Sequence, residues 1–323
     1  MRPIRRILVA IKDPGARSLP AVAKAAWLAR ACGAHLELFH SVKASVFANT
    51  PAAYEEALLD LHETQRRQYL QRLERIAARL RLHGVKVSTA VEYDYPAYDA
   101  IVRRACLIKA DLIVSGSHRD RHPAAGLLRL TDWELLRQSP VPVLLVKRSR
   151  PYRHPNVLAA VDPCHAHSKP MELDEEILSL GSAIADVLHG KLYAVHAYAP
   201  VAIGSAAASV STSVAVRLEG LGAADAKVQF ERALEGSNIP RARRHLVGDL
   251  PDAAINQVAR RTQSDIVVMG ALSRSGLKRL IIGNTAERLL DELPCDLLIV
   301  KPAQFASRVT GTCKGPRLVA RAG

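Results

Sequence analysis

The chain has 323 residues, 49% of them hydrophobic and 24% charged, with a formal net charge of +14. The length suits two domains of about 100–200 residues each, and the composition excludes wholesale disorder, collagen-like repeats and coiled-coil rods. Aromatic residues make up only 4% of the chain, which argues against the stacking platforms that bind single-stranded nucleic acid.

The first element is expected at residues 6–11, where the chain reads RILVAI before Lys12 interrupts the apolar run. This run is shorter than the roughly 7–15 apolar residues of a signal peptide and the roughly 20 of a membrane span. We therefore interpret it as a strand and expect a cytoplasmic protein with no membrane span. The five cysteines include no CxxC pair, so we expect reduced thiols and no disulfide framework.

Strands alternate with helices along residues 1–150. The expected strands are 6–11, 35–41, 85–91, 111–116 and 142–147, and the expected helices are 19–32, 53–83, 96–108 and 130–138. Uninterrupted apolar runs such as ILVAI and VLLV are typical of strands that are buried on both faces of a parallel sheet. In the long helix at 53–83, leucines recur at helical spacing and the arginines between them are expected to lie mainly on the solvated face.

The same pattern returns in residues 151–303. The expected strands are 156–161, 191–197, 241–247, 265–270 and 296–301, and the expected helices are 172–188, 213–236, 250–262 and 283–292. Residues 111–147 and 265–301 align without a gap at an offset of 154, each opening with Asp and a strand that ends in Gly. The sequence therefore predicts an internal repeat.

Right-handed crossovers between parallel strands make each repeat a doubly wound α/β domain of the Rossmann or flavodoxin kind. We expect one domain at 1–148 and one at 154–303, joined by a Pro- and Arg-rich linker. A basic, mobile tail is expected at 304–323.

Charge is distributed unevenly between the repeats. Residues 1–150 hold 25 Lys and Arg against 14 Asp and Glu, whereas residues 151–303 hold 16 against 17. A basic half can attract nucleic acid, which stays open as an alternative function, although such binding weakens steeply as salt rises.

One loop of the second repeat has the parts of a phosphate cradle. Gly270 and Gly276 allow positive φ and a close approach of the backbone to a ligand, and Gly283, Asn284 and Thr285 open a helix whose free N–H groups favour anions. Asn284 or Thr285 also suits an ordinary helix N-cap, which needs no ligand. The loop matches neither GxxxxGK[ST] nor GxGxxG.

The loop resembles the G-x2-G-x9-G-[ST] segment of nucleotide-binding universal stress proteins. The phrases GNTAERLLDELPCDLLIVKP and TDWELLRQSPVPVLLVK resemble the tandem E-type of that family in bacteria. The resemblance covers almost the whole chain, once per half. It implies a cytoplasmic stress-response protein whose domains pair two by two, within one chain in a tandem protein; further pairing between chains and an unknown protein partner stay open.

Carried over residue by residue, the resemblance implies a site for ATP in the second half alone. Asp162 matches the position near adenine and ribose, Ala197 the position near adenine, and Met269 and Gly270 the strand end beside the ribose. The loop positions are Ser273, Arg274, Gly276, Gly283, Asn284 and Thr285. Two of these depart from the pattern, since Ser273 replaces the second glycine and Asn284 replaces Ser or Thr.

The first half departs further. Arg119, His122 and Arg129 stand where the second half has Ser273, Gly276 and Gly283, and Lys12 stands where it has Asp162. Bulky side chains in place of glycines should close the cradle. We therefore predict that residues 1–150 do not bind ATP in the manner of the family.

Two other groups of residues could carry chemistry. Asp162, Cys164, His165 and His167 are zinc-ligand types, but their spacing fits no standard zinc site, so no metal site is predicted. His40 and His196 sit at matching strand ends and are interpreted as equivalent structural positions rather than a catalytic pair.

No nucleophile motif or pair of catalytic carboxylates is present, so we expect no enzyme, or at most slow hydrolysis of ATP. The resulting hypothesis is a non-catalytic regulatory protein that binds ATP in its second half. A nucleotide-free interaction scaffold and a pocket for a different ligand, including zinc, stay open, since a fold does not fix a function.

Overall fold

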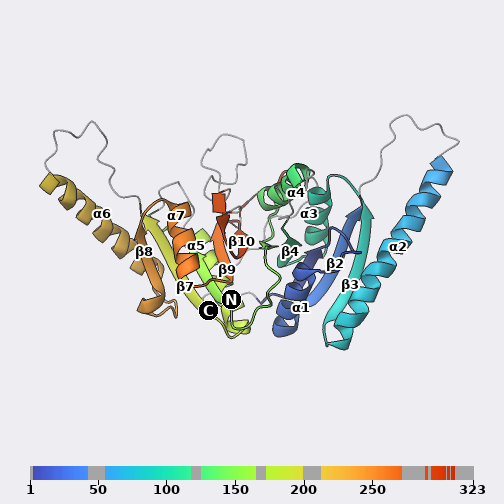
Figure 1. Cartoon of the computed structure of the whole chain (residues 1–323), viewed down its shortest axis with the longest axis horizontal. Helices are drawn as coiled ribbons and strands as arrows, with labels where there is room; N and C mark the ends of the chain where they lie inside the picture. Colours follow the sequence, from blue (N-terminus) through green and yellow to red (C-terminus); the bar gives the residue numbers. More distant parts are fainter. Residues whose placement is uncertain are drawn as a thin grey trace. The chain divides into compact units, whose positions relative to one another are not determined.

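The computed structural model describes residues 3–42, 55–117, 125–164, 172–198, 212–270, 288–289, 292–302, 304–305 and 307–309. The chain divides into two compact units (Figure 1), residues 2–152 and residues 153–302, with residues 303–323 assigned to the first. We call these units the first half and the second half.

The first half contains a parallel sheet with helices between its strands. In chain order its elements are β1 (Arg6–Ala10), α1 (Pro20–Cys32), β2 (His35–Val42), α2 (Glu55–Leu82), β3 (Lys86–Tyr93), α3 (Ala97–Leu107), β4 (Leu112–Gly116), α4 (Ala125–Gln138) and β5 (Val143–Val146). The strands lie in the order β3-β2-β1-β4-β5, and every pair among them is parallel.

The second half repeats this topology. Its elements are β6 (Asn156–Ala160), α5 (Glu172–Val187), β7 (Lys191–Tyr198), α6 (Thr212–Ala233), a 3-10 turn η3 (Arg241–Arg243), β8 (Arg244–Gly248), α7 (Pro251–Arg261), β9 (Ile266–Gly270) and β10 (Asp296–Val300). The strands lie in the order β8-β7-β6-β9-β10, again all parallel. The predicted fold, a doubly wound α/β domain occurring twice, is confirmed.

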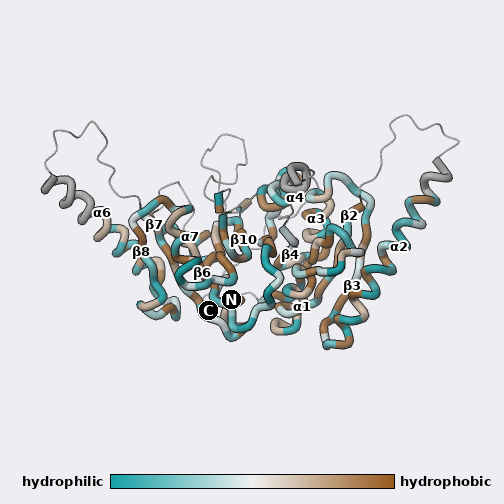
Figure 2. Tube along the Cα trace, in the orientation of Figure 1, coloured by the Kyte–Doolittle hydropathy of each residue, from teal (hydrophilic) through white to brown (hydrophobic). Residues whose placement is uncertain are grey.

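The core of each half follows from the apolar strands. Residues of β1, β4 and β5 are almost completely buried, as are those of β6, β9 and β10. Figure 2 shows brown, hydrophobic segments in both halves. Since strand order reverses after β1, right-handed crossovers put α1 and α2 on one face of the sheet and α3 and α4 on the other. The contact between α3 and α4 agrees with this arrangement.

Two expected elements differ from those observed, and a third lies almost entirely outside the described residues. Helix α4 begins at Ala125, five residues before its predicted start at 130. The predicted strand at 241–247 begins only at Arg244, because residues 241–243 form the 3-10 turn η3. The predicted helix at 283–292 lies almost entirely outside the described residues, of which 288–289 and 292 are helical.

Helix α2 covers the edge strand β3, and its arginines are exposed, as expected. Two of them also reach the strand: the Arg81 guanidinium donates to the Val87 carbonyl (2.9 Å from Nη2) and also contacts Glu74, while Arg66 donates to the Val91 carbonyl (3.5 Å). Edge carbonyls that are satisfied in this way are less available for pairing with another strand.

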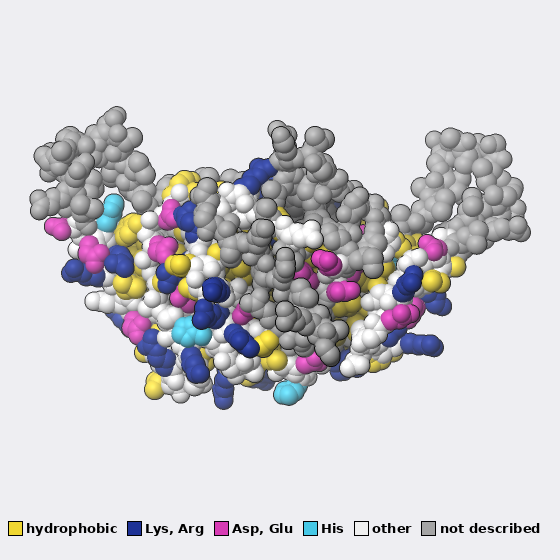
Figure 3. Space-filling model, turned by 180° about the vertical axis from the view of Figure 1, so that it is seen from behind, with side chains coloured by type: hydrophobic (Ala, Val, Ile, Leu, Met, Phe, Trp, Pro, Cys, Tyr) yellow, Lys and Arg dark blue, Asp and Glu magenta, His cyan; other side chains and the backbone are white. Residues whose placement is uncertain are grey.

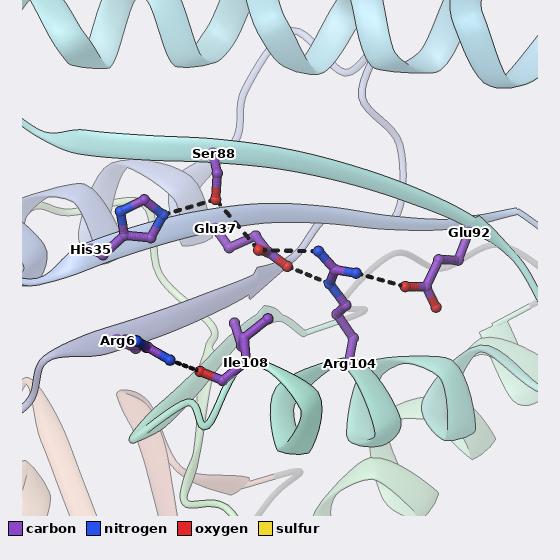
Figure 4. Close-up of polar contacts among 7 residues, drawn as sticks. All are labelled: Arg6, His35, Glu37, Ser88, Glu92, Arg104 and Ile108. Carbon is purple, nitrogen blue, oxygen red and sulfur yellow. Dashed lines mark hydrogen bonds and ion pairs between the residues drawn. The ribbon is translucent and has the colours of Figure 1, made fainter.

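Helix α3 is fastened to β2 and β3 by a buried carboxylate (Figure 4). Glu37 is 6% exposed and receives two hydrogen bonds from the Arg104 guanidinium (2.6 and 3.3 Å). Arg104 also reaches Glu92 (3.1 Å), and Ser88 lies between Glu37 and His35. One arginine thus ties its helix to two neighbouring strands.

The described part of the tail begins against the first half. The Arg308 backbone N–H donates to the side chain of Gln138 (3.3 Å), and Val309 is 5% exposed. On the face drawn in Figure 3, basic and acidic side chains are interspersed.

Candidate functional site

The candidate site lies where β7, β6 and β9 end, side by side, in the second half. Strand order reverses between β6 and β9, since β7 follows β6 on one side and β9 adjoins it on the other. In open α/β sheets, ligands bind outside the carboxyl ends of the strands at such a switch point. The structure therefore brings together the predicted residues Asp162, Ala197, Met269 and Gly270.

Asp162 is held in place through its backbone. It follows β6 by two residues and is half-buried, and its N–H donates to both carboxylate oxygens of Asp174 (3.1 and 3.3 Å). Asp174 is 5% exposed and lies in the first turn of α5, where the helix dipole favours a negative charge. The Asp162 carboxylate is thus carried on a fixed backbone at the switch point.

The end of β9 is shaped by packing. Gly270 is half-buried, and a Cβ added there would lie 2.7 Å from Cδ2 of Leu173 and 3.4 Å from Cδ1 of Ile177. Its φ is not in the positive region, so the prediction that positive φ explains this glycine is wrong. The close approach of α5 explains it instead. Met269, just before it, is 6% exposed, and Ala197 in β7 is half-buried.

The remaining predicted residues lie in segment 271–287, outside the described residues: Ser273, Arg274, Gly276, Gly283, Asn284 and Thr285. The helical residue that follows this segment is anchored. Arg288 donates to the Asp252 carboxylate (2.8 Å) in the first turn of α7, and this hydrogen bond lowers the pKa of Asp252. Residue 288 is therefore tied to the start of α7.

The corresponding position in the first half carries the opposite charge. Lys12 follows β1 and places its ammonium 2.5 Å from the carboxylate of Asp132 in α4, which is 3% exposed. Burial lowers the pKa of Lys12, and the nearby carboxylate offsets part of that effect. Arg119 and His122 lie outside the described residues, as does the side chain of Arg129.

The two strand-end histidines hold equivalent positions, as predicted. Nδ1 of His40 donates to the Ile11 carbonyl (2.7 Å), and Nδ1 of His196 donates to the Val161 carbonyl (3.2 Å). Only His196 also meets a thiol, since its Nε2 lies 3.4 Å from Sγ of Cys164.

Two further findings concern metal binding and membrane insertion in the described part of the chain. Within those ranges, no three His, Cys, Asp or Glu side chains are grouped to hold a metal ion. His165 and His167 lie outside those ranges. In the same part of the chain, no helix has the length and hydropathy that a membrane crossing requires.

Sequence reasoning missed the residues that position the site. Asp174 and the Asp252–Arg288 pair act on it through contacts between separate elements. The only local signal for either aspartate was an acidic residue in the first turn of a predicted helix.

Comparisons with known proteins agree with the repeat. The profile of the universal stress protein family matches residues 3–147 and 156–301. The chain is 30% identical to universal stress protein E of Escherichia coli strain K12 over 232 residues, covering 70% of this chain and 72% of that protein. It is 26% identical to universal stress protein E of Photorhabdus laumondii over 307 residues, covering 92% and 95%.

Solved structures show the same architecture. A protein of unknown function from Pseudomonas aeruginosa PAO1 has a TM-score of 0.69 at 26% identity, covering 93% of each chain. A universal stress protein from Archaeoglobus fulgidus has a TM-score of 0.61 at 13% identity, covering 91% of this chain and 98% of that one. The latter likeness concerns the fold alone.

Proposed function

Because the chain belongs to the universal stress protein family and carries two of its domains in tandem, as the E-type relatives do, we propose that it is a non-catalytic stress-response protein that binds ATP in its second half. Binding would be its means of regulation. No nucleophile with an adjacent base and orienting group is proposed for turnover of the nucleotide, so any hydrolysis is slow.

The observation that carries this proposal is the carboxylate of Asp162 at the switch point between β6 and β9. Its backbone is held by Asp174, so less ordering of this part of the chain is needed when the carboxylate accepts hydrogen bonds from ribose or base. Gly283, Asn284 and Thr285 are proposed to hold the phosphates through backbone N–H groups at a helix start.

A single site per chain is proposed because the first half has rebuilt the same position. Lys12 replaces the acceptor carboxylate with an ammonium and is engaged with Asp132. A ribose hydroxyl needs an acceptor at this position. It would instead meet the Lys12 ammonium, a donor that is already paired with Asp132.

The test is calorimetric titration of the full chain with ATP and magnesium. We expect one site per chain, with binding weakened at least tenfold in Asp162→Ala and in Gly283→Arg. Asp162→Ala removes an acceptor, and Gly283→Arg fills the cradle. The matched control is Asp13→Ala, which removes an exposed carboxylate beside Lys12 in the first half and should leave affinity unchanged.

Two outcomes would contradict the proposal. Two sites per chain would show that the first half binds as well. No heat and no thermal shift would favour the second candidate, a nucleotide-free interaction scaffold. That candidate gains support from Ser273 and Asn284, which replace the glycine and the Ser or Thr of the family pattern.

We also propose that the two halves pair within one chain and that the protein works in the cytoplasm. Domains of this family pair two by two, so two domains in one chain can pair with each other without a second chain. Further pairing between chains is an outcome of the mass measurement described below.

A further inference from the structure

Cys164 and His196 form a thiol–imidazole pair beside the site. Cys164 is exposed, and its Sγ lies 3.4 Å from Nε2 of His196, which is 2% exposed. Because the Val161 carbonyl can only accept, Nδ1 of His196 carries the ring proton. Nε2 is therefore the ring nitrogen that faces the thiol and can accept its proton. A nucleophile that reaches a base held by a third group is the arrangement that activates thiols.

The first half supplies an internal comparison. His40 makes the same hydrogen bond to Ile11, but its ring packs against Tyr69 with centroids 4.6 Å apart. Pro14 stands at the position of Cys164. The histidine thus serves the fold in both halves, while the thiol is an addition of the second half.

The surroundings of Cys164 determine how it would react. Partial burial and the carboxylates of Asp162 and Asp225 raise the pKa of this thiol, so the sulfur keeps its proton at neutral pH. The thiolate is the nucleophile in thiol chemistry. Reaction therefore requires a base that removes the proton as the sulfur attacks, and Nε2 of His196 is placed to do so.

We propose that Cys164 is a site of oxidation by hydrogen peroxide, with His196 as the general base. The sulfur attacks one peroxide oxygen, so an S–O bond forms as the O–O bond breaks. The thiol proton passes to Nε2 of His196 and then to the departing hydroxide, which leaves as water. The sulfur is oxidised by two electrons to a sulfenic acid, and the peroxide is reduced to water.

The experiment treats the reduced full chain with hydrogen peroxide and dimedone at pH 7 and follows each cysteine peptide by mass spectrometry. We expect Cys164 to be labelled at least tenfold faster than Cys32, a half-buried thiol at the end of α1 whose pKa burial raises. His196→Asn keeps a donor toward Val161 and removes the base, so it should slow Cys164 at least tenfold. The matched variant His40→Asn should leave the rate at Cys164 unchanged.

A second measurement separates base catalysis from a structural role of His196. As the pH rises from 7 to about 10.5, past the ordinary thiol value, a growing share of Cys164 is thiolate without help from a base. The ratio of the Cys164 rates in the unmodified protein and in His196→Asn should therefore fall as the pH rises. The proposal is overturned if Cys164 reacts no faster than Cys32 at pH 7, if His196→Asn leaves its rate unchanged there, or if the ratio stays constant across this range.

Discussion

Single residues determine how closely α5 can approach the sheet. Gly270 ends β9 beneath Leu173 and Ile177. Gly116 stands at the same position in the first half, where an added Cβ would lie 4.0 Å from Cβ of Ala21 and within 4 Å of no other described residue beyond its chain neighbours. The two glycines look alike in the sequence, but the space around them differs. They form a matched pair for mutation.

We predict that Gly270→Ala lowers the free energy of unfolding by about 1–3 kcal/mol, because the new methyl group would overlap a fully buried Leu173. Gly116→Ala should change it by well under about 1 kcal/mol, since its Cβ meets ordinary van der Waals contact. Urea denaturation followed by circular dichroism measures both. If both variants lose equally little stability, α5 can shift to accommodate the new methyl group at little cost.

Glu176 is a buried acid in α5, 6% exposed. Burial, followed by the charge of Glu172, raises the pKa of Glu176 to about 7. Because the folded protein holds this proton more tightly than the unfolded chain, ionisation of Glu176 costs stability. The stabilising contribution is complete below about pH 4.5 and is lost as pH rises through 7.

We therefore predict that Glu176→Gln matches the unmodified protein near pH 4.5 and exceeds its unfolding free energy by about 1–3 kcal/mol at pH 8. Urea denaturation at the two pH values checks this. The control is Glu175→Gln, an exposed neighbour in the same helix, which should show no such pH dependence. A constant difference between Glu176→Gln and the unmodified protein at both pH values would refute the prediction.

At the scale of elements, Arg104 joins α3 to β2 and β3 (Figure 4). Its removal would leave the Glu37 carboxylate, only 6% exposed, without its main partner. A buried charge that loses its partner is more costly than the absence of both charges. We call the contacts of Arg104 with Glu37 and Glu92 the clamp. It predicts that mutations of Arg104 and Glu37 have non-additive effects on stability.

We predict that Arg104→Met destabilises the protein by about 2–4 kcal/mol and that adding Glu37→Leu recovers most of the loss. Denaturation of the single and double variants measures the coupling. Arg67→Met breaks the exposed pair with Glu63 in α2 and should cost less than about 0.5 kcal/mol. Strictly additive effects of the two core mutations would contradict the clamp.

The elements themselves were predictable, because uninterrupted apolar runs and helical leucine spacing are local signals. The boundaries that failed were of a different kind. The start of α4 at Ala125 follows a polar, basic stretch, SHRDRHPA, whose sequence carries no helical periodicity, and residues 241–243 close a 3-10 turn that alternation of polarity does not reveal.

The site was predictable only in part. Repeats and a resemblance placed Asp162, Ala197, Met269 and Gly270 at neighbouring strand ends, which the topology bears out. The contacts that fix the site were hidden, since Arg288 and Asp252 are 36 residues apart and Asp162 meets Asp174 only in the folded chain.

At the scale of the whole molecule, the proposed pairing of the two halves predicts a monomer of 35.1 kDa by light scattering at micromolar concentration, because each half would already have its pairing partner within the chain. A concentration-independent mass of twice that value would show that the chains pair again. Measurement with and without ATP would reveal whether the nucleotide changes the association.

Because Lys12 pairs with Asp132, the stability of the first half does not depend on the concentration of a ligand bound at this position. A bound ligand stabilises a protein in proportion to the logarithm of its free concentration, so its contribution disappears on dilution or metabolic depletion. A side chain tethered to the same backbone has a fixed effective concentration. The ion pair between Lys12 and Asp132 therefore stabilises the first half to the same extent at any nucleotide concentration in the cell.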